Sequence, residues 1–82
     1  MQGGNEMKDL LEIMVKNLVT KKDEVIVLVN EDDNTINLNL QVAKEDIGKI
    51  IGKNGKIIRS IRTVVKAGAF NTKKRIIVEI ME

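Results

Sequence analysis

The sequence predicts an α+β domain whose elements follow the order helix, strand, strand, helix, helix, strand. Apolar residues recur at helical spacing in the first, fourth and fifth of these segments. The other three segments are β-branched or alternate strictly between apolar and polar residues. The chain has 82 residues, no proline and no internal repeat, which suits a single domain.

The first helix is expected to run from Met7 to about residues 21–22, where two lysines suit the negative end of a helix dipole. Asn5 is placed to cap its start. Its apolar face repeats at i, i+3 and i+4 through Met7, Leu10, Leu11, Met14, Val15 and Leu18. Residues 1–6 show no apolar pattern, so we expect a disordered leader or expression remnant, followed by one domain over residues 7–82.

An antiparallel hairpin is expected next. Residues 25–29 form a continuous β-branched run, which favours a strand buried on both faces or central in its sheet. A turn cluster at residues 30–34 leads into residues 35–42, which alternate strictly. The inward positions of this second strand are Ile36, Leu38, Leu40 and Val42. A last strand is expected at residues 75–81, with Ile76, Val78 and Ile80 on one face.

Two helices are expected between the hairpin and the last strand. The first covers residues 43–51, and the second starts at Gly55 or Lys56 and ends near Gly68. On a helical wheel the second helix divides into two arcs. The apolar arc holds Ile57, Ile58, Ile61, Val64 and Val65. The opposite, basic arc holds Lys56, Arg59, Arg62 and Lys66.

Composition excludes several classes of protein. The chain has no Cys and no His, which removes disulfides, thiol nucleophiles, Ser-His catalysis and ordinary zinc sites. The carboxylates of Glu45, Asp46 and Glu79 are not paired with a nucleophile or a metal ligand in the pattern. We therefore predict no catalytic residue, no metal and no cofactor. No apolar run approaches the roughly 20 residues that span a bilayer, so no membrane segment is predicted and the cytoplasm is the expected compartment.

Positive charge is concentrated in one segment of a nearly neutral chain. Residues 44–66 hold seven Lys or Arg against two acidic residues, net +5, whereas residues 1–43 hold four Lys against eight acidic residues, net −4. The whole chain carries only +2. A local excess of this kind indicates a local anionic partner, although a solvated helix face would show the same run of charge.

The stretch IIGKNGKII, residues 50–58, places two glycines and two lysines between the two helices. Glycine permits positive φ, and Asn54 tolerates it better than most residues. The second helix begins at this loop, so its free N–H groups and the positive end of its dipole face an approaching ligand. Such a loop is suited to a phosphate group. It does not match the nucleotide-binding G-x-x-x-x-G-K-[ST] pattern, because Ile50 and Ile57 stand where Gly and Ser or Thr are required.

Residues 47–69, IGKIIGKNGKIIRSIRTVVKAGA, resemble the core of a KH domain, with Gly52-Lys53-Asn54-Gly55 as its G-x-x-G loop. The element order resembles the type II arrangement, and the short length resembles the small stand-alone bacterial KH proteins of the KhpA family. The resemblance implies a three-stranded mixed sheet with three helices packed on one face. It also implies a non-catalytic protein that binds short single-stranded RNA, clamped at its backbone by the loop.

The expected RNA-binding residues surround the loop. They are Ile47, Lys49, Ile50, Ile51, Gly52, Lys53, Asn54, Gly55, Lys56, Ile58 and Arg59. The isoleucines among them are expected to divide between the core and the floor of the groove. The only aromatic residue is Phe70, which we expect in the core rather than under a base. RNA-binding folds that depend on aromatic stacking are therefore disfavoured.

Resemblance to the KhpA family also implies partners and roles. RNA chaperone activity or post-transcriptional regulation is implied, together with a homodimer and pairing with a larger KH protein of the KhpB or Jag type. The alternative function is a dimerisation or protein-interaction module in which the basic helix contributes only to solubility. We expect a dimer to use the flank of the long helix near Ile61, Val65 and Phe70. A DNA-reading helix-turn-helix is disfavoured, because Ile57 and Ile58 stand where base-reading polar residues are needed.

Overall fold

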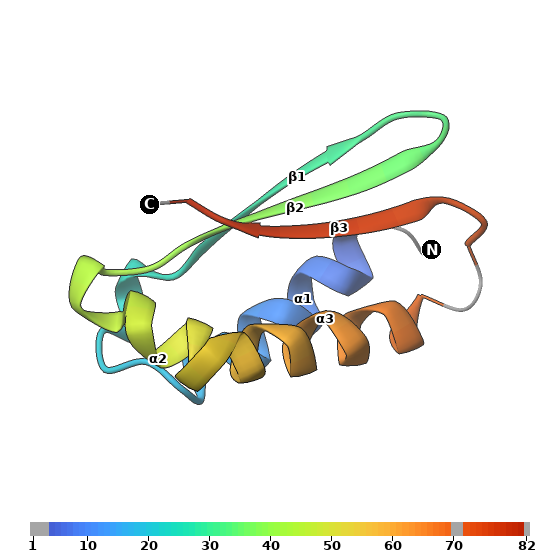
Figure 1. Ribbon diagram of the computed structural model, residues 1–82. Helices are drawn as coiled ribbons and strands as arrows, with labels where there is room; N and C mark the ends of the chain where they lie inside the picture. Colours follow the sequence, from blue (N-terminus) through green and yellow to red (C-terminus); the bar gives the residue numbers. More distant parts are fainter. Residues whose placement is uncertain (1–3, 70–71, 82) are drawn as a thin grey trace.

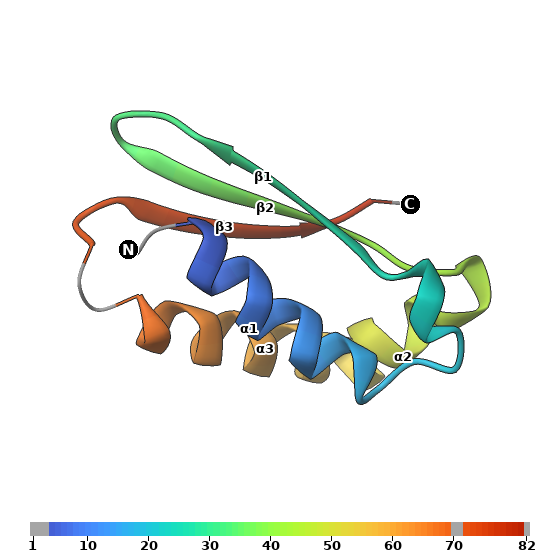
Figure 2. The ribbon, with the colours of Figure 1, turned by 180° about the vertical axis from the view of Figure 1, so that it is seen from behind.

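Three helices lie under one face of a three-stranded sheet in the computed structural model, which describes residues 4–69 and 72–81 (Figure 1, and from behind in Figure 2). The elements are α1 (Gly4–Lys16), β1 (Ile26–Glu31), β2 (Thr35–Gln41), α2 (Ile47–Ile51), α3 (Lys56–Gly68) and β3 (Arg75–Ile80). Short 3-10 turns at Lys22–Glu24, Lys44–Asp46 and Lys53–Gly55 precede β1, α2 and α3. The expected element order and the placement of the helices on one face are confirmed.

The sheet is mixed, with the strands in the order β1-β2-β3. β1 and β2 form the expected antiparallel hairpin, with Val27 opposite Leu40. β2 and β3 are parallel, with Leu38 opposite Val78. Parallel neighbours need a long crossover, and α2 and α3 supply it. The connection through α2 and α3 therefore returns the chain to the sheet beside β2 and makes β3 an edge strand.

The expectation that the first strand is central or buried on both faces is wrong. β1 is an edge strand, and only its helix-facing residues are buried. Val27 is 3% exposed, whereas its neighbour Leu28 is 47% exposed on the open face. Helices cover only one face of the sheet, so an uninterrupted apolar run still alternates between core and solvent.

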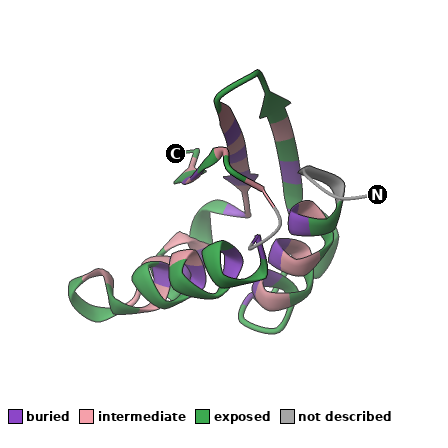
Figure 3. Cartoon of the chain, turned by 90° about the vertical axis from the view of Figure 1, so that its right-hand side faces the viewer, coloured by how far each residue is buried: buried purple, intermediate pink, exposed green. Residues whose placement is uncertain are grey.

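The core lies between the helices and the sheet. Alternate residues of β2 point into it, as the sequence predicts, and Ile36, Leu38 and Leu40 are completely buried. α1 and α3 contribute the rest of the helical layer, and Figure 3 shows their buried residues facing inward. The buried helical residues are Met7, Leu11, Val15, Ile50, Ile58, Ile61 and Val65.

α1 ends earlier than the sequence predicts. Its last helical residue is Lys16 rather than a residue near 21–22, and it is described from Gly4, so Asn5 lies within the helix. The chain then turns, and the backbone N–H groups of Thr20 and Lys21 each donate to the Asp46 carboxylate at 3.0 Å. Residues after Lys16 are thus held by a tertiary contact to the start of α2 instead of continuing the helix.

Candidate functional site

Three of the four residues in the loop between α2 and α3 have positive φ, a backbone conformation that favours glycine. Gly52 has φ 75° and ψ 175°, and it both ends α2 and begins the 3-10 turn Lys53–Gly55. Asn54 (φ 57°) and Gly55 (φ 74°) also have positive φ. A Cβ on Gly52 would lie 2.6 Å from Cγ1 of Ile57, which is far inside van der Waals contact. The sequence prediction of positive φ at these positions is confirmed.

Cationic side chains flank the point where this loop enters α3, and the backbone N–H groups of Gly55 and Lys56 bond within the loop, to Gly52 and Lys53. Gly55 precedes the helix without any side-chain cap, so the positive end of the helix dipole faces the loop. Lys53 and Lys56 are exposed on either side. The Arg59 guanidinium turns back and donates from Nη2 to the Asn54 carbonyl oxygen at 2.9 Å. This bond ties the loop to the first turns of the helix.

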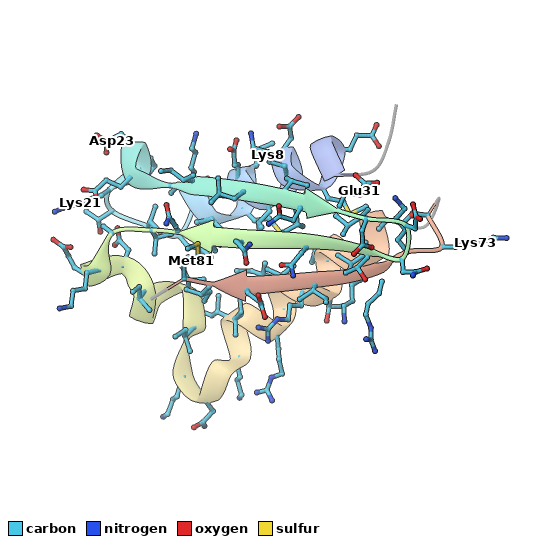
Figure 4. All side chains as sticks on the ribbon, turned by 90° about the horizontal axis from the view of Figure 1, so that it is seen from above. Lys8, Lys21, Asp23, Glu31, Lys73 and Met81 are labelled. Atoms are coloured by element: carbon cyan, nitrogen blue, oxygen red, sulfur yellow. The ribbon has the colours of Figure 1, made fainter. Side chains whose placement is uncertain are left out.

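Beside the loop, α3 and the edge strand β3 enclose a groove. Figure 4 shows the α2–α3 hairpin projecting past β3 when the sheet is viewed from above. The groove has two hollows that share Arg62 and Glu79. The hollow next to the loop is lined by Asn39, Ile51, Ile58, Arg62, Glu79, Ile80 and Met81. The second is lined by Arg62, Lys66, Arg75, Ile76, Ile77, Val78 and Glu79. We call these two hollows the α3–β3 groove.

Three of the four candidate isoleucines divide between the core and the groove, as the sequence analysis expects, but Ile47 lies in neither. Ile50 is fully buried and belongs to the core. Ile58 is in the core cluster and also lines the groove. Ile51 is half-buried in the groove wall. Ile47 is half-buried at the start of α2 and lines neither hollow.

Arg62 was not among the expected binding residues, yet it crosses the groove. Its Nε donates to the Val78 carbonyl oxygen of β3 at 3.1 Å, and the residue is half-buried. The sequence placed it on the basic arc opposite the core. Its i, i+4 spacing from Ile58 and Lys66 was the available signal, since residues at this spacing share one flank of a helix.

Lys49 is directed away from the loop. Its ammonium donates to the Thr20 hydroxyl and lies 3.4 Å from Asp46 Oδ1. The pKa of the Asp46 carboxyl is lowered, first by the Lys21 backbone N–H, then by that of Thr20, with a smaller contribution from Lys49. Lys49 therefore helps to hold the segment between α1 and β1 against the start of α2.

The expected dimer contact stays a prediction, and little of the flank proposed for it is exposed in the single chain. Ile61 and Val65 are buried in the core, and Phe70 lies outside the described residues. The apolar surface on the helical layer is instead a hollow between α1 and α3. Its apolar lining consists of Met14, Leu18, Ile57, Ile61 and Val64.

Two helices joined by a G-x-x-G loop, packed on a mixed sheet with the strand order β1-β2-β3, define a type II KH domain. The family model described as "KhpA/KhpB, KH domain" matches residues 8–80, and the chain belongs to that family. A Clostridium acetobutylicum protein named "RNA-binding protein KhpA" is 51% identical over 75 residues, covering 92% of this chain and 100% of its own length. A Borreliella burgdorferi protein of the same name is 46% identical over 79 residues, covering 96% and 95%. No solved structure matches the chain.

The described part of the chain has neither a cluster of metal ligands nor a helix that could span a membrane. Within it, no group of three or more metal-ligating side chains is close enough to hold an ion. None of the helices in residues 4–69 and 72–81 combines the length and apolar character that crossing a bilayer requires.

Proposed function

We propose that this protein is a non-catalytic binder of single-stranded RNA, with the phosphate backbone held at the Gly52–Gly55 loop. The observation that carries the proposal is the loop itself, whose three positive-φ residues open an uncapped helix start between two exposed lysines. Curated relatives of nearly the same length are named RNA-binding proteins.

The loop chemistry favours phosphate. No heavy atom of a non-adjacent residue lies within 4 Å of the place where a Cβ on Gly55 would stand, so a phosphate can approach this backbone, and Lys53 and Lys56 supply positive charge. Phosphate oxygens are bound at such helix starts by N–H groups and the dipole together. Arg59 supports the loop by binding the Asn54 carbonyl, which reduces the cost of ordering the loop when RNA arrives.

The groove beside the loop favours unpaired bases. Ile51, Ile58 and Ile80 are the aliphatic side chains that line the hollow next to the loop. Bases that lie on this surface must be unstacked from a duplex, as in most sequence-reading RNA modules. Aliphatic contacts are weaker than aromatic stacking, so we expect modest affinity, which suits an RNA chaperone or a post-transcriptional regulator acting in the cytoplasm.

A loop variant tests the proposal. The double substitution Lys53→Asp and Asn54→Asp places two carboxylates where phosphate would lie, and RNA binding should be lost while the fold is retained. The matched control is Lys73→Asp with Asn30→Asp, which makes the same change in charge at two exposed positions, the first before β3 (Figure 4) and the second in β1. Gel shift measures binding, and circular dichroism measures folding on the same samples. Loss of binding in the control alone, or unchanged binding in the folded loop variant, would remove the loop from the mechanism.

A second function, protein association, is favoured by the hollow between α1 and α3. Val64 is 45% exposed and Leu18 is 38% exposed there, beside Met14 and Ile57. A homodimer or a pairing with a larger KH protein would cover these side chains and leave the α3–β3 groove on the other flank of α3 open. Sedimentation velocity over a range of concentrations should show a dimer that Val64→Asp weakens. A chain that stays monomeric at tens of micromolar contradicts the homodimer.

A further inference from the structure

Two opposite charges border the α3–β3 groove without meeting. Arg62 and Glu79 are the residues shared by both hollows, one from α3 and one from β3. Arg62 is held by its bond from Nε to Val78, and no ion pair joins it to Glu79. Glu79 is exposed, and its side chain has no hydrogen bond or ion pair with any described residue. The groove therefore contains a fixed donor and an unused acceptor.

The carboxylate is the informative member of this pair. A negative charge repels phosphate, so Glu79 opposes the backbone contact that the lysines of the loop favour. A carboxylate in such a groove suits the base side of a nucleotide, because base amino and imino groups are hydrogen-bond donors. The position of Glu79 fits that side, since it belongs to β3, the strand that borders the groove, and not to the loop or the helix that carry the lysines.

The Arg62 side chain is oriented for the complementary contact. Only Nε is used by the bond to Val78, so the terminal nitrogens of the guanidinium remain as donors at the groove. An Arg fork matches the paired O6 and N7 acceptors of guanine. Because the backbone carbonyl fixes Nε, little rotamer freedom remains to be lost when a base binds.

We propose that Arg62 and Glu79 together select a guanine base in the α3–β3 groove, a proposal that rests on RNA binding as the function of this site. Guanine alone among the four bases presents adjacent acceptors to the guanidinium and two neighbouring donors, N1–H and N2–H₂, to the carboxylate. Uracil offers a single N–H between two carbonyl oxygens, which the carboxylate repels. The apolar residues Ile51, Ile58 and Ile80 give the flat face of the base a surface on the loop side.

Binding of four heptanucleotides tests the base preference. Each is UUUXUUU, with X as G, A, C or U. The flanking uridines let the strand shift until X occupies the groove, and a single guanine does not form higher-order structure. Fluorescence anisotropy should give about five- to tenfold tighter binding for X = G than for X = U, the lower range for one good base contact.

Two variants assign the preference to the proposed residues. Glu79→Gln should lower the G-over-U ratio to about twofold or less, and binding of the all-uridine strand should not weaken, because the change removes a charge that repels phosphate. Arg62→Lys keeps the charge but loses the fork, and it should lower the same ratio. The control is Asp33→Asn, which removes one negative charge from the exposed hairpin turn and should leave the ratio unchanged.

The outcomes separate this proposal from the function it rests on. If all four strands bind equally, and the loop variant Lys53→Asp with Asn54→Asp abolishes that binding, RNA binding stands and the guanine site is wrong. A guanine preference that survives Glu79→Gln in a folded protein also overturns the guanine site. If no strand binds the wild-type protein, the proposed function itself fails. A guanine preference lost in both groove variants and kept in the control supports the proposal.

Discussion

Replacing Gly52 by alanine should destabilise the domain far more than the same change at Gly55. Both residues have positive φ, 75° and 74°. A Cβ on Gly52 would lie 2.6, 2.8 and 2.9 Å from three carbons of Ile57, whereas a Cβ on Gly55 would meet nothing within 4 Å. Gly55→Ala therefore costs only the left-handed backbone conformation, about 1–2 kcal/mol. Gly52→Ala adds overpacking to a strained backbone, together about 2–6 kcal/mol.

Urea unfolding followed by far-ultraviolet circular dichroism measures both losses, since the chain has no Trp or Tyr to report by fluorescence. Ile57→Ala provides a second check, because it removes two of the three colliding carbons. The loss caused by Gly52→Ala should be smaller in the Ile57→Ala background than in the wild type. Equal losses for the two glycine variants, or no coupling to Ile57, would refute the steric reasoning.

Three other predictions follow from the fold and the groove. Val27→Ala should cost more unfolding free energy than Leu28→Ala, although leucine is larger, because Val27 is 3% exposed and Leu28 is 47% exposed; the reverse order in urea titrations would contradict the edge position of β1. The Asp46 pKa is lowered in the folded state, so its stabilising contribution is present above the unfolded pKa of about 3.9 and is lost as pH falls through the folded value. Asp46→Asn should be less stable at pH 7 and lose less stability on acidification below about pH 4, and a variant with wild-type acid sensitivity would count against this linkage. RNA affinity should fall with salt at a log–log slope of about −1.4 to −2.8, for roughly two to four phosphate contacts to a single strand, and a salt-independent affinity would contradict the phosphate clamp.

Local patterns in the sequence determined most of the secondary structure and the form of the loop. The alternation of residues 35–42 predicted which side chains of β2 are buried, because a strand exchanges its faces at every residue. Gly52, Asn54 and Gly55 predicted positive φ because this conformation depends on the residue itself and its immediate neighbours. The start of α3 at Lys56 follows from the same signals.

Only the tertiary structure decided which faces are covered and which distant residues meet. An apolar run such as residues 25–29 is compatible with a central or an edge strand. The strand order made β1 an edge strand, and the single layer of helices left Leu28 exposed. The segment after α1 is held by Asp46, 25 residues or more away in sequence from the N–H groups it binds. Arg62 bonds to the edge of β3 and lines the same groove as Glu79 because the crossover places β3 beside β2. No local periodicity encodes such contacts, since they depend on the packing of whole elements against one another.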